Sequence, residues 1–422
     1  MEQPRMPFPR QDGEMTCGPF RVRELAERFG TPLYLYHFDA VRERYEAFQE
    51  AFAGVNLQVA YSMKANGNLA LLNRLAALGA GADIVSGGEL FRALKAGVEP
   101  GKILFAGVGK TEKELREGLN ARIYSFNVES TGELHQLEAL ARERDGRAPF
   151  GMRINPDIVS PTPHEYTRTG HAETKFGLPV PVAVGLYRWA ATRPHLRPRG
   201  IDVHIGSQIV DVTPYKKALR AVLEVVHLLK KDGVSLEYLD LGGGFGVAYD
   251  GVPMDIAALG EALVPIMKNS GLRLILEPGR ALVGEAGLLL TTVLSLKKSG
   301  EKTFVITDAG MTELIRPSHY GGYHAIESVV ESPEREVRPL DVVGPVCETG
   351  DFLARDREMP IPRAGELLAV RTAGAYGATM GSNYNARPRP PEVMVEGEEV
   401  HVVRERESYE DLVRNEVIPP VP

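Results

Sequence analysis

The chain has 422 residues, of which 43% are hydrophobic and 25% charged, a composition typical of a globular protein with a large core. Its length suits a barrel of about 250 residues accompanied by a second domain. The 56 acidic and 49 basic residues give a net charge of −7, which argues against a surface that binds nucleic acid.

The N-terminal segment is polar. Met1 to Gly18 lacks the apolar stretch of a signal peptide, and the longest apolar run, Ala286 to Leu296, is too short to span a bilayer. We therefore expect a cytoplasmic protein that does not enter a membrane. Cys17 and Cys347 are the only cysteines, so no disulfide framework is expected.

A helix, a strand and a second helix are the first predicted elements. Apolar residues recur at helical spacing over Val22–Phe29, and Gly30–Pro32 ends that helix. Leu33–Phe38 is a predicted strand. Asp39 can cap the next helix, whose apolar stripe continues to Phe52.

From Leu57 onward, short apolar strands alternate with segments of helical periodicity. The helical segments include Leu69–Leu78, Pro181–Arg193 and one that opens with the capping box Thr111–Glu114. The eight predicted strands are Leu57–Ser62, Ala82–Val85, Ile103–Ala106, Tyr124–Val128, Phe150–Ile154, Ile201–Ile205, Tyr238–Leu241 and Leu274–Glu277. Eight such repeats predict a closed (β/α)8 barrel, with an open doubly wound sheet as the alternative.

After Ala281 the helical periodicity fades and short strands follow one another. These predicted strands are Leu288–Leu296, Phe304–Thr307, Glu336–Val343, Glu366–Val370 and Val393–Val403, the last with a hairpin turn at Glu396–Glu399. We predict an α/β protein in which residues 38–282 form the barrel. Residues 1–37 and 283–422 together form an all-β domain, like a sandwich or a barrel, with a short helix over Ser408–Arg414.

Polar side chains gather where the predicted barrel strands end. They are Lys64, Asp83, Asn127, Arg153, His204, Gly242–Gly244 and Glu277. Because barrel enzymes place their chemistry at the C-terminal ends of the strands, we expect these residues to share one site. Lys64 follows an apolar strand, and partial desolvation would make its amine nucleophilic. Taken alone, Lys64 is more typical of a surface lysine than of a catalytic one.

Two segments after the last two predicted strands indicate a site for a phosphorylated cofactor. Gly242–Gly244 allows backbone N–H groups to approach an anion closely, and Arg280 could bind the same phosphate or a substrate carboxylate. Glu277 would lie in the barrel mouth, where a carboxylate needs a partner such as a protonated ring nitrogen. A plain tight turn and a buried salt bridge are the alternatives.

Two more residues follow the sixth predicted strand. His204 could stack on a flat cofactor ring and Ser207 could donate a hydrogen bond to phosphate, although His204 also suits a core histidine with a satisfied hydrogen bond. The histidines and cysteines show no metal-binding spacing, so no metal is predicted.

The predicted β domain contributes Arg316, Tyr320, Cys347, Glu348 and Tyr376, each within a short motif. Each is a weak signal alone. A buried structural thiol is the default interpretation of a lone cysteine, and a surface salt bridge is that of Arg316.

Seven motifs in order resemble those of the diaminopimelate decarboxylases, which are pyridoxal-phosphate decarboxylases built on an alanine-racemase-like barrel. The motifs lie at Tyr61–Asn66, His204–Gln208, Gly242–Gly246, Glu277–Arg280, Leu314–Tyr320, Gly344–Asp351 and Gly374–Gly377. The resemblance extends roughly from Gly30 to Asn385, which is almost the whole chain.

The resemblance implies a role for each matching residue. Lys64 would carry pyridoxal phosphate as a Schiff base, His204 would stack on its ring, Glu277 would pair with its ring nitrogen, and Cys347 would donate a proton. The implied cofactor-binding set is Lys64, Asp83, His204, Ser207, Gly242, Gly243, Gly244, Glu277, Pro278, Gly279, Arg280 and Tyr376. The implied substrate-binding set is Arg280, Arg316, Tyr320, Glu348 and Tyr376. The resemblance also implies an obligate homodimer in which Cys347 and Glu348 reach the active site of the neighbouring subunit.

Two residues favour meso-2,6-diaminopimelate as the substrate, which the family converts to L-lysine and CO₂ in the last step of lysine biosynthesis. Glu348 stands where ornithine decarboxylases of the eukaryotic type carry an aspartate, and Arg316 supplies a cation for the distal carboxylate. The loop Pro161–Gly170 resembles the family's mobile loop but carries Arg168 where a smaller residue is usual.

Other activities on the same scaffold remain as alternatives. One is a decarboxylase of ornithine, arginine, lysine or carboxynorspermidine. A racemase would need a second base on the opposite face of the ring and lacks the Cys347–Glu348 block. A regulatory pseudoenzyme would have lost Lys64 or the phosphate glycines, and both are present.

Overall fold

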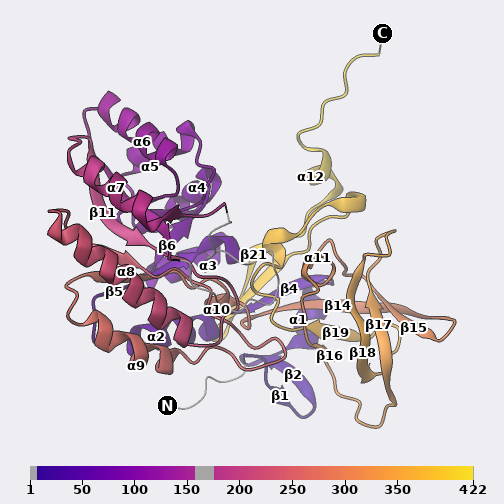
Figure 1. The fold of residues 1–422 in the computed structure, drawn as a ribbon. Helices are drawn as coiled ribbons and strands as arrows, with labels where there is room; N and C mark the ends of the chain where they lie inside the picture. Colours follow the sequence, from indigo (N-terminus) through magenta and orange to yellow (C-terminus); the bar gives the residue numbers. More distant parts are fainter. Residues whose placement is uncertain (1–6, 157–174, 422) are drawn as a thin grey trace. The chain divides into compact units, whose positions relative to one another are not determined.

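The computed structural model describes residues 7–156 and 175–421. The chain forms two compact units (Figure 1). The barrel unit comprises residues 42–247 and 252–282, and the β unit comprises 1–41, 248–251 and 283–422. Among the described residues, no helix is both long and apolar enough to cross a bilayer.

The barrel unit is built on eight parallel strands. They are β5 (Leu57–Ser62), β6 (Gly81–Ile84), β7 (Ile103–Phe105), β8 (Ser125–Val128), β9 (Ala148–Asn155), β11 (Leu196–Asp202), β12 (Tyr238–Asp240) and β13 (Arg273–Leu276). Each pairs with the next, and β13 pairs with β5 through Leu276 and Val59, which closes the ring. The predicted barrel is therefore confirmed, and the open sheet is excluded. A short strand, β10 (Leu178–Pro179), adds to β9.

Helices alternate with these strands (Figure 1). They are α2 (Phe38–Ala51), α3 (Leu69–Ala77), α4 (Gly87–Lys95), α5 (Glu112–Ala121), α6 (Thr131–Glu143), α7 (Val180–Ala191), α8 (Thr213–Lys231), α9 (Ile256–Met267) and α10 (Arg280–Val283). The predicted capping box is confirmed, since Thr111 and Glu114 satisfy each other's backbone N–H groups at the start of α5. Asp39 was predicted to cap α2, but the helix already begins at Phe38, so Asp39 lies in its first turn; it also accepts the N–H of Gly397 at 2.8 Å.

The barrel interior is filled by side chains. Ala60, Leu104, Tyr124, Tyr238 and Ile275 form one buried cluster, and the Tyr238 hydroxyl donates to Ser125 Oγ at 2.8 Å. The sixth strand differs from its prediction, because β11 runs from Leu196 to Asp202 and its pairing with β12 stops there. A filled interior leaves the strand ends, and the loops that follow them, as the place for chemistry.

The β unit contains a sheet of nine strands that takes in the N-terminal segment, as predicted. Its strands are β4 (Leu33–His37), β14 (Gly287–Ser299), β15 (Lys302–Thr307), β16 (Ile326–Ser328), β17 (Val337–Val343), β18 (Phe352–Pro360), β19 (Leu367–Val370), β20 (Glu392–Glu396) and β21 (Glu399–Arg404). The long strand β14 pairs with β4, β15 and β19. The predicted hairpin turn is confirmed between β20 and β21, where Gly397 adopts a φ of 56°.

A smaller sheet and three helices complete the β unit. The sheet joins β1 (Arg10–Gln11), β2 (Glu14–Cys17) and β3 (Phe20–Arg21), and the helices are α1 (Val22–Phe29), α11 (Arg316–Tyr320) and α12 (Tyr409–Val413). The predicted C-terminal helix is confirmed as α12, with Ser408 as its N-cap. The core of this unit brings Cys17 of β2 against leucines of β4 and β14.

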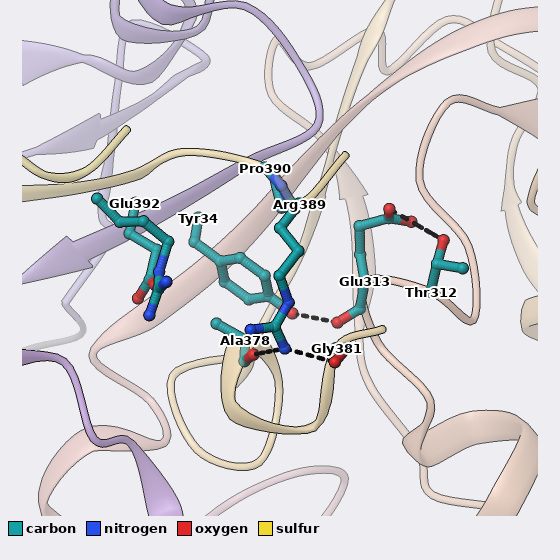
Figure 2. A pocket seen from close by; sticks show the side chains of 9 residues that line it. Tyr34, Thr312, Glu313, Ala378, Gly381, Arg389, Pro390 and Glu392 are labelled. Carbon is teal, nitrogen blue, oxygen red and sulfur yellow. Dashed lines mark hydrogen bonds and ion pairs between the residues drawn. The ribbon is translucent and has the colours of Figure 1, made fainter. Parts of the chain in front are cut away.

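Tyr34 of β4 supports the turn that carries Tyr376. The Tyr34 hydroxyl donates to the carbonyl of Glu313 at 2.6 Å (Figure 2). Arg389 donates to the carbonyls of Ala378, at 3.2 Å, and of Gly381. Arg389 therefore holds the segment that follows Tyr376, and Tyr376 itself has a left-handed backbone with a φ of 57°.

Candidate active site

The amine of Lys64 lies beside a buried carboxylate. Lys64 sits in a short 3₁₀ turn directly after β5, and its Nζ is 3.3 Å from Asp83 Oδ2 at the end of β6. The Lys64 side chain is 40% exposed, whereas that of Asp83 is fully buried. The Ser62 hydroxyl also donates to Asp83 Oδ2, at 2.6 Å. Lys64 is therefore oriented by Asp83 and still accessible. A freely solvated surface lysine would be accessible but not oriented.

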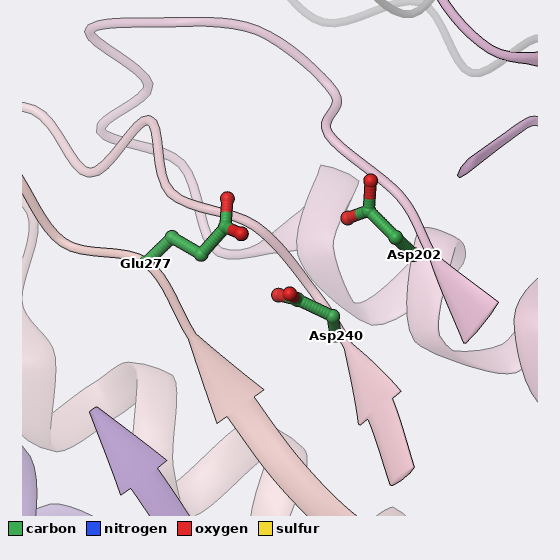
Figure 3. A group of neighbouring side chains, drawn as sticks. All are labelled: Asp202, Asp240 and Glu277. Carbon is green, nitrogen blue, oxygen red and sulfur yellow. The ribbon is translucent and has the colours of Figure 1, made fainter. Parts of the chain in front are cut away.

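Three carboxyl groups lie together at the ends of β11, β12 and β13 (Figure 3). One oxygen from each of Asp202, Asp240 and Glu277 lies within 4.8 Å of the others, and all three residues are buried. Burial is the main cause that raises the pKa of Asp240 to about 7 and the pKa values of Glu277 and Asp202 well above their usual range. Mutual repulsion among the carboxylates adds to this effect.

Two oxygens of this cluster, Glu277 Oε1 and Asp202 Oδ1, are buried and have no hydrogen-bond partner within residues 7–156 and 175–421. An acceptor left in this state costs free energy unless a donor reaches it. A protonated ring nitrogen would supply both a donor and a positive charge. By donor type, three carboxylates would also suit a metal ion, so the absence of a metal stays a prediction.

Asp202 and Asp240 are site residues that were not predicted from the sequence. Each stands at the end of an apolar strand, in Ile201–His204 and in Leu239–Leu241. A lone carboxylate between buried aliphatic residues is the signal that could have identified them. Arg153 at the end of β9 supplies positive charge here, with its guanidinium 3.3 Å from Glu129 and 3.9 Å from Asp202.

The glycine run is packed tightly against its neighbours. The N–H of Gly242 donates to Asp240 Oδ1 at 3.0 Å, and the N–H of Gly243 donates to His204 Nδ1 at 3.2 Å. A Cβ on Gly243 would lie 2.1 Å from the carbonyl oxygen of Glu277. At least two of the three glycines therefore direct their N–H groups to the protein's own side chains.

His204 is held in its neutral form. Burial, with Arg153 and Lys64 nearby, keeps the pKa of His204 well below its usual value. Its Nδ1 accepts the N–H of Gly243, so a proton on the neutral ring belongs to Nε2. A neutral imidazole offers a flat, uncharged face, which suits stacking on an aromatic ring.

Two residues that were predicted to bind phosphate lie together, although they follow different strands. Arg280, at the start of α10, donates from Nη2 to Ser207 Oγ at 3.2 Å. Pro278 and Gly279 pack against the Lys64 strand: the N–H of Ser62 donates to the carbonyl of Pro278 at 3.3 Å, and a Cβ on Gly279 would lie 2.9 Å from Ser62 Cβ. Arg280 and Ser207 therefore provide a cation and a hydroxyl at one place, as phosphate binding needs.

In the β unit, Cys347 and Glu348 are exposed on the turn after β17. Cys347 Sγ lies 3.3 Å from Asn385 Oδ1. Asp351 braces this turn by accepting the N–H groups of Met311 and Val346 at 2.6 and 2.7 Å. The buried structural thiol is Cys17 instead, and burial raises its pKa.

Arg316 differs from its default interpretation as a surface salt bridge. The residue is only 8% exposed, and its guanidinium contacts His324. Tyr320 ends the same short helix, α11, and Tyr376 is half-buried on its braced turn. The loop that contains Arg168 lies outside the described residues.

Comparison with known proteins identifies the family. The family model "Pyridoxal-dependent decarboxylase, pyridoxal binding domain" matches residues 38–284. A diaminopimelate decarboxylase of Aquifex aeolicus is 46% identical over 408 residues, with 96% of each chain covered. One from Neisseria meningitidis serogroup B is 47% identical, with 95% of this chain and 96% of that protein covered. The chain belongs to the diaminopimelate decarboxylase family of pyridoxal-dependent decarboxylases.

Solved structures of family members share the fold over nearly their whole length. The Helicobacter pylori diaminopimelate decarboxylase complexed with L-lysine has a TM-score of 0.89 at 40% identity, covering 93% of this chain and 98% of that one. The M. jannaschii diaminopimelate decarboxylase in complex with L-lysine has a TM-score of 0.92 at 38% identity, covering 98% of each chain. Pyridoxal phosphate is accordingly the cofactor of this family member, and the Glu277 oxygen and the Lys64 amine fit its ring nitrogen and its aldehyde in chemical type.

Proposed function

We propose that the chain decarboxylates meso-2,6-diaminopimelate to L-lysine and CO₂, the last step of lysine biosynthesis. The observation that carries the proposal is the site at the end of the barrel. There Asp83 holds the Lys64 amine, and Glu277 Oε1 is a buried acceptor without a hydrogen-bond donor among the described residues. The relatives that match nearly full length are named diaminopimelate decarboxylases, and two related structures hold L-lysine.

The barrel residues would hold the cofactor. Lys64 Nζ is the proposed point of covalent attachment, and Asp83 fixes the direction of that amine. Glu277 would keep the ring nitrogen protonated, and neutral His204 would stack on the ring. When bound, pyridoxal phosphate supplies a sink for the electron pair that remains on Cα after CO₂ has left.

The remaining proposed cofactor residues surround the phosphate. Arg280 and Ser207 would bind it directly, with Tyr376 of the β unit as a further ligand. Gly242–Gly244 would contribute mainly through close packing, since the N–H groups of Gly242 and Gly243 donate within the protein. Pro278 and Gly279 would support Arg280 from the adjoining segment.

The β-unit residues would bind the substrate and return a proton. Arg316 is proposed to bind the distal carboxylate, with Tyr320, Glu348 and Tyr376 as further contacts and Arg280 as a contact from the barrel. The Cys347 thiol is the proposed donor of the proton that Cα takes up after CO₂ has left. The side chain of Cys347 is exposed, so its sulfur is accessible, and the contact with Asn385 Oδ1 can orient it.

The direct test uses purified protein with pyridoxal phosphate and meso-diaminopimelate, and it measures L-lysine and CO₂. Ornithine, arginine, lysine and carboxynorspermidine serve as parallel substrates. Preferential turnover of any of these would assign the chain to the alternative decarboxylases. Arg316→Ala should lower kcat/KM for diaminopimelate more than for lysine, because lysine lacks the distal carboxylate; an equal effect would mean that this carboxylate binds elsewhere.

We also propose a cytoplasmic homodimer with shared sites, in which Cys347 and Glu348 act at the partner's barrel. Both residues are exposed in the described chain, which supports a role outside it. Lys64→Ala and Cys347→Ala subunits should each be inactive alone. Mixed in equal amounts they should recover about a quarter of the wild-type activity, because half of the dimers would contain one intact site. No recovery in subunits that exchange freely would contradict shared sites.

The domain limits 38–282 for the barrel, and 1–37 with 283–422 for the β domain, are likewise a proposal. Hydrogen exchange of the native protein with mass mapping of the amides would test them. Amides on the two sides of residues 37 and 282 should exchange with different opening free energies.

A further inference from the structure

The guanidinium of Arg316 has an unusual partner. Arg316 Nη1 lies 2.6 Å from His324 Nε2, and both side chains are buried in the β unit, with His324 fully so. Buried arginines usually pair with carboxylates, which cancel much of their charge. Here one of the contacting groups is an imidazole.

The second nitrogen of His324 fixes the state of its ring. Nδ1 lies 2.8 Å from the carbonyl oxygen of Arg371. A carbonyl oxygen only accepts, so Nδ1 carries the hydrogen, and an arginine only donates, so Nε2 offers its lone pair. His324 is therefore the neutral Nδ1–H tautomer, and it orients Arg316 without cancelling its positive charge.

A third residue contacts the same guanidinium from another direction. Arg316 Cζ lies 4.5 Å from the ring centroid of Tyr249, and the Tyr249 and His324 rings meet edge to face with centroids 5.2 Å apart. Tyr249 comes from the short segment 248–251, which belongs to the β unit. His324 therefore contacts a nitrogen of the guanidinium, and the central carbon of the guanidinium lies over the Tyr249 ring.

The histidine is itself well anchored. His324 binds the carbonyl of Arg371. The side chain of Arg371 donates from Nε to Glu327 at 2.8 Å and from Nη2 to the carbonyl of Phe8 at 3.2 Å. Arg357 donates to the His324 carbonyl at 2.7 Å. These contacts fix the imidazole, and through it one N–H of Arg316.

We propose that His324 is a positioning residue that presents Arg316 in one orientation to the distal carboxylate of the substrate. This inference rests on the proposed function. A guanidinium binds a carboxylate best when its fork is fixed in advance, because little rotational freedom is then lost on binding. A neutral acceptor provides that fixation without adding a negative charge of its own, so His324 favours a substrate with a second carboxylate over one without it.

Two variants of His324 separate its two hydrogen bonds. The amide of His324→Gln can place an acceptor where Nε2 stands, facing Arg316. The shorter amide of His324→Asn can replace only the Nδ1 donor to Arg371. In the holoenzyme, His324→Asn should raise KM for meso-diaminopimelate by about tenfold or more with kcat changed less than threefold, whereas His324→Gln should stay within about threefold of wild type in KM.

Controls distinguish the possible outcomes. Melting temperature and bound-cofactor absorbance of both variants should match wild type, and turnover of lysine, if measurable, should respond equally to both. Equal KM values for His324→Asn and wild type, or equal losses in the two variants, would overturn this inference alone. Absence of wild-type turnover of meso-diaminopimelate would overturn the proposed function and this inference with it.

A readout without substrate tests the tautomer itself. In holoenzyme labelled with ¹⁵N-histidine, the signals that disappear in His324→Gln identify the ring. Its nitrogens should show hydrogen on Nδ1 and a bare Nε2 at pH 8. An Nε2–H tautomer at this pH would overturn the proposal, whatever the activity of the variants.

Discussion

Lys64 Nζ lies 3.3 Å from Asp83 Oδ2, and the pair joins an accessible amine to a fully buried carboxylate. The carboxylate is fixed by the Ser62 hydroxyl, which donates to the same oxygen at 2.6 Å. Asp83 thus limits where the Lys64 amine can go without covering it. This arrangement suits a lysine that must react with an aldehyde and later release it.

Lys64→Ala should abolish covalent attachment of the cofactor. The wild-type protein with pyridoxal phosphate should absorb near the edge of the visible range, and borohydride should fix the cofactor to the peptide that contains Lys64. The variant should lose both signals because it has no amine at this position. Lys102→Ala is the matched control, since Lys102 is an exposed lysine of the same unit that pairs with Glu99. Retention of the absorbance band in Lys64→Ala would show that the lysine is misassigned.

Gly243→Ala should destabilise the protein even without cofactor. A Cβ at this position would lie 2.1 Å from the Glu277 carbonyl oxygen, and that backbone cannot move without displacing β13. We expect a loss of roughly 2–4 kcal/mol in the free energy of unfolding of the cofactor-free protein. Gly185→Ala in α7 is the control, because its Cβ would meet no atom within 4 Å, and it should be neutral or slightly stabilising. Equal stabilities in urea would leave phosphate binding as the reason for glycine at position 243.

The barrel could be predicted because the sequence features that indicate it lie close together along the chain. Short apolar strands repeat with helical segments between them, and a polar residue after each strand points to one end of the barrel, as with Lys64 and Asp83. The partners of the glycines could not be predicted in this way. Gly243 meets His204, which lies 39 positions earlier in the chain, and the same run of three glycines would serve an exposed phosphate loop equally well. Hydrophobic periodicity does not predict contacts between residues that are distant in the sequence.

In the β unit, even fewer of the side-chain contacts could be predicted from the sequence. That β4 joins this sheet could be expected from its position before the barrel, whereas the contacts of Arg316 depend on Tyr249 and His324, which no motif connects. The cluster of Asp202 and Asp240 with Glu277 arises because three neighbouring strands end at the same level. Strand register is a property of the closed barrel and is not visible in any single strand.

Stability of the cofactor-free protein should fall as pH rises from about 4 to about 7. Burial raises the pKa of Asp240 to about 7, and those of Glu277 and Asp202 also rise, whereas the unfolded chain titrates its carboxyls near pH 4. The folded state then binds more protons in this window, so each unit of pH lowers its relative stability. We expect the melting temperature to drop by about 5 °C or more between pH 5 and pH 8.

Asp240→Asn is the control for this pH dependence. Its amide oxygen can still accept the N–H of Gly242, and the substitution removes one titrating group from the cluster. The decrease in melting temperature should therefore be smaller than in wild type, and the variant should be the more stable of the two at pH 8. Identical profiles for the two proteins would show that Asp240 is ionised throughout and that the cluster does not hold extra protons.

Cys347 should be the only thiol that reacts in the native protein. Its side chain is exposed, whereas Cys17 is buried in the β-unit core and burial raises its pKa, which suppresses the thiolate that alkylating reagents need. Iodoacetamide should add one group per native chain, at Cys347, and two after unfolding. Modification should stop turnover in step with labelling.

Replacement of the same residue separates cofactor binding from proton donation. Cys347→Ala should keep the absorbance of bound cofactor and lose turnover by about a hundredfold or more, since proton transfer by a positioned group typically contributes that much. Cys347→Ser tests whether the thiol itself matters, because a hydroxyl is a similar size and a much weaker acid. Cys17→Ala should leave both absorbance and turnover unchanged. Near-normal turnover in Cys347→Ala would remove this residue from the acid role and direct attention to Tyr376 of the same unit.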